Sequence, residues 1–511
     1  MRRMHRISSQ QPHALHATAA TRALEAAASA ALPPCTLIQR AGDAVARLAL
    51  ALAPHARTIW IACGAGNNGG DGLEAAALLQ AAGLPVCASL LGVPEHLPTD
   101  AAASWQRARS AGVRFVDAPP ALGPQDLCVD ALFGLGLAAR PRARAPDARL
   151  PQWLAHLRGS AATLLSVDLP SGLMADTGTW ASGFDAGDHA GTGPRHTLSL
   201  LTLHPGLFTA HGRDAAGTVW LDDLGVDAGR QTPAAYLCGM PAPAPRPHAS
   251  HKGSYGDVAV LGGEGLAARG MGMTGAAVLA AVAALHGGAG RVLLALLDGG
   301  ATTALAQYPE LMLRRPDALN LAQAAVVCGC GGGAAVADVL PRVLAQAGRL
   351  VLDADALNAI AADAGLQALL AARAQHGALT TVLTPHPLEA ARLLDSCAAA
   401  VQADRLAAAA TLARRFGCTV VLKGSGSIIA APGQIPLITP TGNALLATAG
   451  TGDVLAGLVG ARLAAAPHAS HEAAQQAAAG ACWQHGAAAD AWSADQALTA
   501  LRLAQALHHK T

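Results

Sequence analysis

A glycine-rich loop near the start of the chain carries polar side chains that could take part in chemistry. Its sequence, GAGNNGGDG at residues 64–72, follows an apolar run that ends at Cys63. Glycines let the backbone approach a ligand and present N–H groups at a helix N-terminus, where anions bind. The spacing satisfies the dinucleotide fingerprint, but the acid that a dehydrogenase needs about 20 residues further on is missing. Asn67, Asn68 and Asp71 therefore indicate side-chain chemistry here, with a ligand-free tight turn as the alternative.

Two aspartates end apolar runs in the same half of the chain. Asp130 lies in VDALFGLG and Asp168 in VDLPSGL, and a glycine-containing loop follows each of them. Burying a carboxylate is costly unless a cation, a hydrogen-bond donor or a substrate compensates it. An aspartate that only caps the next turn is the alternative for either one. Together with an asparagine carbonyl and a serine hydroxyl, such carboxylates form an all-oxygen set suited to a hard cation, sodium and potassium included.

The second half of the chain contains a different glycine loop, TAGTGDVLAG at residues 448–457. Glycines at a helix N-terminus supply N–H donors for phosphate oxygens, and Asp453 in this turn could take a hydroxyl proton during phosphoryl transfer. An aspartate that caps a buried helix is the alternative. Upstream, Lys423 ends an apolar run and opens the loop KGSGS, which suits one wall of an adenine-nucleotide site. Lysine occurs at only two other positions, Lys252 and Lys510, so its retention at Lys423 indicates a chemical need.

Both halves show the pattern that would place these loops at one edge of a parallel sheet. Short β-branched or Leu/Val runs alternate with longer Ala/Leu stretches, which is typical of βα units. Ligands of such sheets bind at the carboxyl ends of the strands. A Pro/Ala-rich stretch at residues 239–250 (GMPAPAPRPHAS) separates the halves as a linker. The predicted strands are 58–63, 85–90, 126–132, 163–168 and 197–203 in the first half, and 257–261, 291–297, 324–328, 350–353, 379–383 and 419–423 in the second.

Composition limits the classes of function. The 511 residues are 52% hydrophobic and carry 35 basic and 34 acidic side chains, so a disordered chain and a strongly basic nucleic-acid or membrane-surface protein are both disfavoured. No apolar run reaches the 18 or so residues needed to span a bilayer. The cysteines form no C-x-x-C pair, which fits a reducing cytoplasm. Residues 1–14 are arginine-bearing and are expected to be a frayed extension, with an organellar transit peptide as the alternative.

The first half resembles the YjeF N-terminal domain, the NAD(P)H-hydrate epimerase family. The motifs GAGNNGGDGL, VDALFGLGL and SVDLPSGL carry the resemblance. It implies a Rossmann-like three-layer domain, a potassium ion held by Asn68, Asp130 and Ser171, and Asp168 as both a substrate ligand and the catalytic acid/base. The chain departs from the family pattern at Leu135 and His204. By the same resemblance, the hydrated nucleotide is contacted by Asn67, Asn68, Gly69, Gly70, Asp71, Gly134, Leu135, Gly136, Leu137, Ala138, Ala139, Arg140 and Asp168.

The second half resembles the YjeF C-terminal domain, an ADP- or ATP-dependent NAD(P)H-hydrate dehydratase with a ribokinase-like fold. The motifs are HKGSYG, GMTGAA, VLDADALN and LTPHP, in that order. Two departures are Leu388 and the loop CGCGGG at residues 328–333, and His386 has helix capping as an alternative role. The resemblance implies Asp453 as catalytic base and Mg²⁺ bound with the ADP. It assigns the hydrate to Ala276, Gly331, His386 and Asp453, and the adenine nucleotide to Lys423, Gly424, Ser425, Gly426, Ser427 and Gly452.

The sequence therefore predicts an α/β chain with an epimerase domain at 15–231 and a dehydratase domain at 232–511. Such a protein would epimerise the R and S hydrates of NADH and NADPH (NADHX and NADPHX) and dehydrate the S form with ADP, giving AMP and phosphate. We expect a cytoplasmic homo-oligomer that acts on small molecules rather than on nucleic acid or membranes. One alternative is a ribokinase-like kinase of a small alcohol. Another makes the first half a binding module without catalytic activity.

Overall fold

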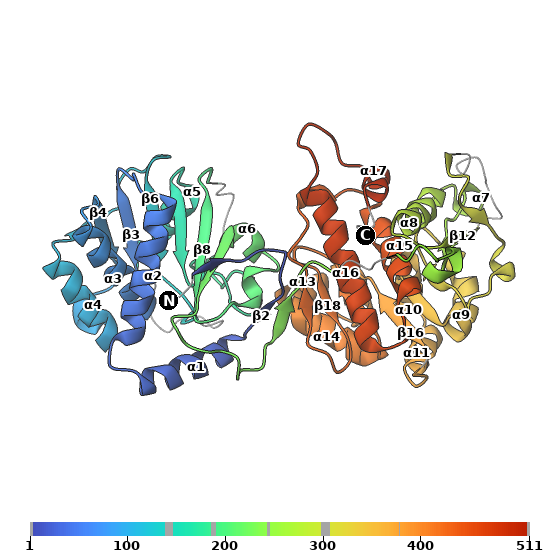
Figure 1. Cartoon of the computed structure of the whole chain (residues 1–511), viewed down its shortest axis with the longest axis horizontal. Helices are drawn as coiled ribbons and strands as arrows, with labels where there is room; N and C mark the ends of the chain where they lie inside the picture. The colour runs from blue at the N-terminus through green and yellow to red at the C-terminus, as the bar shows by residue number, and fades with distance from the viewer. Residues whose placement is uncertain are drawn as a thin grey trace. The chain divides into compact units, whose positions relative to one another are not determined.

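The computed structural model describes residues 4–137, 147–184, 191–242, 246–297, 307–377 and 379–507. The chain divides into two compact units, each with its own sheet (Figure 1). The first unit comprises Met1–Ser8 and Ala14–Ala235, and the second comprises Ser9–His13 and Tyr236–Thr511. Helices and strands alternate along the sequence in both units. This arrangement confirms the predicted α/β class.

The first unit is built on an eight-stranded sheet in the order β1-β9-β8-β7-β6-β3-β4-β5. All neighbouring strands are parallel except β1 and β9. The strands are β1 (His5–Arg6), β3 (Ile59–Cys63), β4 (Val86–Leu90), β5 (Arg114–Phe115), β6 (Leu127–Ala131), β7 (Thr163–Val167), β8 (Arg195–Leu200) and β9 (Thr218–Asp222). The helices are α1 (Thr18–Ala31), α2 (Thr36–Leu52), α3 (Asn67–Ala81), α4 (Thr99–Ser110), α5 (Leu150–Gly159) and α6 (Gly212–Ala216).

Strand β3 shows why this unit has three layers. Its residues alternate between the two faces of the sheet, as side chains of a strand must. Ile59, Ile61 and Cys63 join the apolar cluster of α2 and α3, whereas Trp60 and Ala62 join the cluster of α5. All five residues are fully buried, so a continuous apolar run marks a strand that is covered on both faces.

The second sheet, most of which lies in the second unit, has eleven strands in the order β13-β12-β11-β14-β15-β16-β17-β18-β19-β10-β2. The strands from β13 to β17 are parallel, and β18 is antiparallel to both of its neighbours. The strands are β2 (His13–Leu15), β10 (Ala235–Leu237), β11 (Asp257–Gly262), β12 (Arg291–Leu296), β13 (Met312–Leu313), β14 (Ala325–Cys328), β15 (Arg349–Leu352), β16 (Thr380–Leu383), β17 (Thr419–Leu422), β18 (Ile428–Ala430) and β19 (Leu437–Ile438).

Helices α8 and α15 pack closely within the core of the second unit. A Cβ atom on Gly457 of α15 would lie 2.0 Å from the backbone oxygen of Ala280 in α8, so only glycine permits this approach. The helices of the unit are α7 (Leu266–Arg269), α8 (Thr274–His286), α9 (Val336–Gln346), α10 (Ala354–Ala362), α11 (Ala364–Arg373), α12 (Pro387–Leu393), α13 (Ala398–Ala403), α14 (Arg405–Phe416), α15 (Thr451–Ala465), α16 (His471–Asp490) and α17 (Ala500–Gln505).

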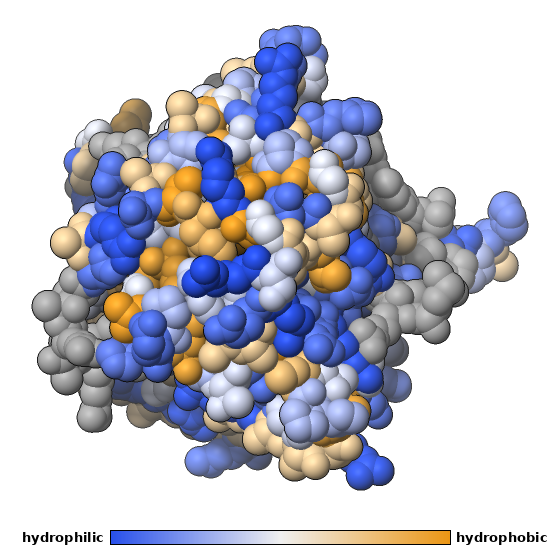
Figure 2. All heavy atoms as spheres, turned by 90° about the vertical axis from the view of Figure 1, so that its left-hand side faces the viewer, coloured by the Kyte–Doolittle hydropathy of each residue, from blue (hydrophilic) through white to orange (hydrophobic). Residues whose placement is uncertain are grey.

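The eleven predicted strands all form, with ends that coincide with the prediction or differ from it by at most three residues. The N-terminal residues differ from the expectation, because the described ones are not frayed. His5 and Arg6 pair with β9, and the backbone oxygen of Ser9 accepts a hydrogen bond from the Trp483 indole at 2.9 Å. Within the described residues, no helix has the length and apolar character that crossing a bilayer requires. The face of the first unit in Figure 2 intersperses hydrophilic and hydrophobic side chains.

Candidate functional site

The first unit contains a cavity of about 580 Å³ where the loops after β3, β6 and β7 meet. This edge is where ligands bind in open α/β sheets. The cavity brings together most of the residues predicted for this half of the chain. Gly69 and Gly70 are not among its described lining residues, and Ala138, Ala139 and Arg140 lie outside the described residues. The predicted residues that line the cavity are Asn67, Asn68, Asp71, Gly134, Leu135, Gly136, Leu137 and Asp168.

The asparagine loop forms the first turn of helix α3. A Cβ atom on Gly64 would lie 1.9 Å from the Leu132 oxygen, and one on Gly69 would lie 1.8 Å from the Gly64 oxygen. These two glycines therefore let the loop fold tightly against the end of β6. The next turn of α3 carries Asp71 toward the cavity, where burial and then the Asp168 carboxylate raise its pKa well above its usual range.

Asp168 has a left-handed backbone conformation at the edge of this cavity. Its φ is 67°, in the left-handed region that few residues other than glycine adopt and that is often found at functional sites. Its Oδ2 accepts a hydrogen bond from the Leu135 N–H at 3.1 Å, whereas its buried Oδ1 has no partner within the described residues. Burial raises the pKa of Asp168, opposed by His204 and by backbone donors. A buried carboxyl group with a raised pKa can both hold and release a proton.

Gly134 allows the Asp168 and Asn68 side chains to lie close to one another. A Cβ atom at this position would be 2.6 Å from Asp168 Oδ2 and 3.0 Å from Asn68 Oδ1. The buried Nδ2 of Asn68 also has no partner in the part of the chain that the structure describes. A buried amide and a buried carboxylate oxygen, both without partners, leave polar groups for a ligand to satisfy.

Asp130 and Ser171 lie in direct contact and line a second cavity of about 350 Å³ in the first unit. The Ser171 hydroxyl donates to Asp130 Oδ1 at 2.5 Å, and the Ser171 N–H donates to Oδ2 at 2.9 Å. Burial raises the pKa of Asp130, and these two hydrogen bonds oppose the rise. Of the three predicted cation ligands, the structure thus brings two together, and no hydrogen bond among the described residues joins Asn68 to either.

Two charged residues of helix α1 were not predicted for this site. Glu25 and Arg22 line the same cavity, and Arg22 donates to the Leu135 oxygen at 2.6 Å. Burial, and then the Asp168 carboxylate, raise the pKa of Glu25. Their sequence context could have indicated a role in the site, because they are the only charged residues in the alanine-rich helix α1.

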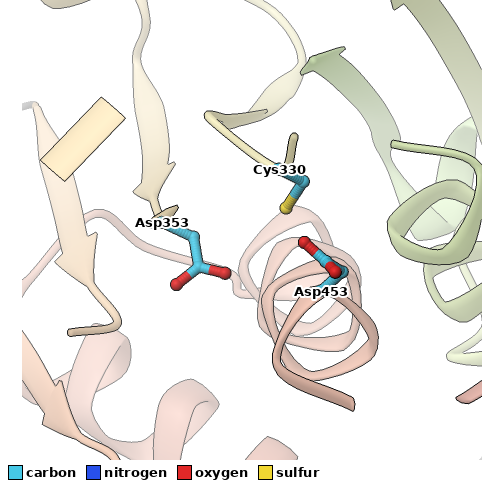
Figure 3. Close-up of side chains that lie close together, drawn as sticks. All are labelled: Cys330, Asp353 and Asp453. Atoms are coloured by element: carbon cyan, nitrogen blue, oxygen red, sulfur yellow. The ribbon is translucent and has the colours of Figure 1, made fainter. Parts of the chain in front are cut away.

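The second unit places Cys330, Asp353 and Asp453 side by side, although they come from three separate segments (Figure 3). Asp353 directly follows β15 and Cys330 lies two residues beyond the end of β14, while Asp453 lies in the first turn of α15. Burial, and then repulsion by Asp353, raise the pKa of Asp453 to about 6. A carboxyl group with such a pKa can act as a general base near neutral pH.

Lys423 completes this group from the end of β17. Its ammonium donates to Asp353 Oδ1 at 2.7 Å, and the Thr384 hydroxyl donates to the same oxygen at 2.8 Å. Burial lowers the pKa of Lys423, but Asp353 and Glu389 more than offset this effect and the pKa is raised overall. A Cβ atom on Gly452 would lie 3.4 Å from the Lys423 ammonium, so the predicted nucleotide residues Lys423 and Gly452 are close to one another.

The other predicted residues of this half lie on nearby loops. Gly331 has φ 58° and approaches Ala276 in the first turn of α8. Gly424, Ser425, Gly426 and Ser427 form the turn between β17 and β18, where the Ser427 hydroxyl donates to the Gly424 oxygen at 3.2 Å.

His386 caps helix α12 in the structure. Its Nδ1 accepts from the N–H groups of Leu388 at 3.1 Å and Glu389 at 3.3 Å. The capping role that the sequence left open is therefore present, and a contact of His386 with the hydrate stays a prediction. The Glu389 carboxylate in turn accepts a hydrogen bond from the His386 N–H at 2.8 Å, and burial raises the pKa of Glu389 to about 7. The spacing H-P-L-E is the signal that could have predicted this reciprocal cap.

The two units together define an enzyme with two acid-bearing sites on separate α/β sheets. Residues 34–206 match the family described as YjeF-related protein N-terminus, and residues 260–510 match the family described as NAD(P)H-hydrate dehydratase. Over 442 residues the chain is 34% identical to the bifunctional NAD(P)H-hydrate repair enzyme of Escherichia coli (strain K12), covering 84% of this chain and 80% of that one. The chain belongs to the family of bifunctional NAD(P)H-hydrate repair enzymes.

Further matches concern the second unit alone. The ADP-dependent (S)-NAD(P)H-hydrate dehydratase of Neisseria meningitidis serogroup B is 43% identical over 222 residues, which are 42% of this chain and 71% of that protein. A solved structure of the ADP/ATP-dependent NAD(P)H-hydrate dehydratase from Bacillus subtilis is 28% identical, covers 52% of this chain and 92% of its own, and has a TM-score of 0.42. The resemblance inferred from the motifs is thus confirmed for both halves.

Proposed function

We propose that this chain repairs hydrated nicotinamide nucleotides in two steps. The first unit epimerises the R and S hydrates of NADH and NADPH, and the second unit dehydrates the S hydrate with ADP, releasing AMP and phosphate. The observation that carries the proposal is the position of Asp453, a half-buried acid with a pKa of about 6 in the first turn of α15, next to Lys423. The family membership supports both activities.

For dehydration, Asp453 takes the proton of the C6 hydroxyl as that oxygen attacks the β-phosphorus of ADP. The bond from the β-phosphorus to the bridging oxygen breaks and AMP leaves. The C6–O bond of the phosphorylated hydrate then breaks, a proton leaves C5, and the C5=C6 double bond of NADH forms with release of phosphate. The N–H groups at the start of α15 would face the phosphate oxygens of bound ADP, as helix N-termini do in other phosphate sites.

For epimerisation, Asp168 serves as the proton carrier. It protonates the C6 hydroxyl, which leaves as water while the N1 lone pair forms a C6=N1 double bond. Water then adds to the opposite face of C6 and returns a proton to Asp168. The unpartnered Oδ1 and the raised pKa of Asp168 support this role. In the Asp168→Asn variant we expect NADH recovery from mixed hydrates to exceed the S share only as fast as spontaneous epimerisation allows. Full recovery at the rate of the unmodified protein would remove Asp168 from the mechanism.

We propose a potassium ion at Asn68, Asp130 and Ser171. The all-oxygen donor set and the burial of the Asp130 carboxylate fit a hard monovalent cation. When bound, the ion would offset the charge of Asp130. Ser171 and Asp130 already hold each other in place, so the ion would need to recruit only Asn68. Exchange of potassium for lithium should lower the epimerase rate and leave the dehydratase rate unchanged, and an unchanged epimerase rate would contradict the site.

We propose that Mg²⁺ enters with ADP, because Mg²⁺ in phosphoryl-transfer sites takes most of its ligands from phosphates and water. It would neutralise phosphate charge during transfer. The setting that we propose is the cytoplasm, which the ten free cysteines support. The net charge of +1 favours small-molecule substrates over nucleic acid or membrane surfaces. We propose a homo-oligomer, whose mass in solution can be measured by light scattering.

The alternative is a kinase of a small alcohol fused to a binding module without catalysis. The open cavity with unpartnered atoms on Asp168 and Asn68 favours an active first unit instead. To separate the two, S-NADHX and ADP are supplied with Mg²⁺, and NADH absorbance and AMP are followed together. Equal amounts of NADH and AMP support the dehydratase. A stable phosphorylated product without NADH would support the kinase.

A further inference from the structure

We propose that Cys330, Asp353 and Asp453 form a site for a thiophilic divalent cation such as Zn²⁺, which blocks the dehydratase when it binds. Within the described residues, this is the group in which three potential metal-ligating side chains converge. The sulfur and one oxygen from each carboxylate all lie within 4.8 Å of one another. The consequence for activity rests on the proposed function, whereas the metal site itself does not.

The spacing of the three ligand atoms is close to that of a zinc site. Zinc–sulfur bonds of about 2.3 Å and zinc–oxygen bonds of about 2.0 to 2.2 Å place tetrahedral ligand atoms about 3.3 to 3.7 Å apart. The upper limit of 4.8 Å in the structure requires the side chains to move inward by about an ångström at most. Figure 3 shows the Cys330 thiol and the Asp453 carboxylate directed toward the same space as Asp353.

The Asp353 side chain has an oxygen free to take a metal ion. The residue is 1% exposed, and Oδ1 accepts from both Lys423 and Thr384. Its Oδ2 accepts no hydrogen bond from any residue that the structure describes. This oxygen is not fully closed off from solvent, so an entering ion can reach it. Metal binding at Oδ2 would leave the ion pair of Lys423 with Oδ1 in place.

The donor set determines which ions fit. One sulfur and two carboxylate oxygens match Zn²⁺ or Co²⁺, whereas Mg²⁺ and K⁺ avoid sulfur. The charges also balance, because a dication with one thiolate, two carboxylates and the Lys423 ammonium sums to zero. Coordination by Cys330 releases the thiol proton to solvent as the metal–sulfur bond forms. Asp453 is partly exposed, so the fourth position is open to water and the ion has a route of entry.

An ion at this site would occupy the oxygen that Asp453 needs as a base. Inhibition should therefore be relieved by chelation and should depend on Cys330, which takes no part in the proposed chemistry. Excess Mg²⁺ should not compete for the sulfur. The site thus makes the dehydratase sensitive to thiophilic metals through a residue that the reaction itself does not use.

The test uses Co²⁺ as a spectroscopic probe on the full chain without nucleotide. We expect a near-ultraviolet thiolate-to-cobalt absorption band in the unmodified protein, lost on addition of Zn²⁺ but not of Mg²⁺. The band should be missing in Cys330→Ser and Cys330→Ala, and retained in Cys397→Ser, whose cysteine is exposed and lies outside the cluster. Circular dichroism of each variant verifies that it is folded.

A second readout measures zinc inhibition of dehydration. For each variant, the dehydratase rate with Zn²⁺ is divided by the rate of the same variant without Zn²⁺. Half-inhibition should need at least about tenfold more Zn²⁺ in Cys330→Ser than in Cys397→Ser. A band that persists in both Cys330 variants, or is missing from the unmodified protein, overturns the metal site. Should the protein lack dehydratase activity altogether, the proposed function fails while the cobalt band still decides the metal site.

Discussion

The ammonium of Lys423 lies 2.7 Å from Oδ1 of Asp353, so the lysine after β17 is held against the aspartate after β15. Both side chains are largely buried. The pair keeps a positive charge at the edge of the sheet where phosphate is expected, beside the first turn of α15. It also compensates one of the two carboxylates that meet there.

Loss of this ion pair should destabilise the second unit. In Lys423→Met the buried Asp353 carboxylate loses its cation, which typically costs about 3 to 5 kcal/mol of unfolding free energy. Lys252→Met removes an exposed lysine and should change stability by less than about 0.5 kcal/mol. Urea unfolding of both variants measures the difference, and equal midpoints would contradict the structural role of the Lys423–Asp353 pair.

Asp453→Asn should abolish dehydration and leave epimerisation intact. The amide cannot accept the hydroxyl proton, so the dehydratase rate should fall by a factor of roughly 10² to 10⁴, the usual contribution of a general base. NADH absorbance with pure S-NADHX and ADP gives the dehydratase rate. Interconversion of R- and S-NADHX, followed by chromatography without ADP, gives the epimerase rate. A near-normal dehydratase rate would show that another group is the base.

Gly457→Ala should destabilise the second unit, because the new methyl group would meet the Ala280 oxygen at 2.0 Å. Overpacking of this kind costs about 1 to 3 kcal/mol. Gly275→Ala, in helix α8, is the matched control, since a Cβ atom there has no neighbour within 4 Å. That variant should be neutral or slightly more stable. A thermal midpoint for Gly457→Ala at or above that of Gly275→Ala would mean that α8 and α15 are not packed this tightly.

Glu389 should make stability depend on pH. Its pKa in the folded chain is about 7, raised from the ordinary 4.5, so the folded state holds a proton that the unfolded state has released between these values. Stability therefore falls as pH rises from about 4.5 to 7. Glu389→Gln removes the ionisation and keeps an acceptor for the His386 N–H. The variant should match the unmodified chain at pH 4.5 and exceed its unfolding free energy by roughly 1 to 3 kcal/mol at pH 8.

The control for this effect is Glu310→Gln, which alters an exposed glutamate of the same unit. The difference in unfolding free energy between Glu310→Gln and the unmodified chain should not change between pH 4.5 and 8. Titratable groups that do not interact with Glu389 contribute equally in all three proteins and cancel, whereas the measured difference includes the coupling of Glu389 to Lys423. A pH-independent difference for Glu389→Gln would show that this carboxyl group ionises normally in the folded chain.

The central parallel strands of both sheets were predictable from sequence because they are buried on both faces and read as continuous apolar runs. The short edge strands were not predictable. Strands such as β1, β5 and β13 have two residues each, and only their partners define them. The turn between β18 and β19 belongs to an antiparallel extension of the parallel sheet, which no periodicity in so few residues could indicate.

Some of the site residues were likewise predictable from sequence, and others were not. Motifs located Asp168 and Asp453 because glycine loops surround them in sequence. The meeting of Cys330 with Asp453 joins residues more than 100 positions apart, and only the fold brings them together. Glu25 was missed because it lies within a helix, away from any strand end. The capping bonds of His386 were foreseeable as an alternative, because a Pro-flanked histidine at a helix start can satisfy the first N–H groups.

The most direct test of two linked activities in one chain uses pure R-NADHX with ADP and Mg²⁺. The second unit alone cannot use this epimer, so NADH appears only if the first unit converts it. We predict complete recovery of NADH absorbance, with one AMP released for each NADH, at a rate well above spontaneous epimerisation. Recovery no faster than spontaneous epimerisation, with S-NADHX still fully converted, would contradict the epimerase assignment and the two-step repair that depends on it.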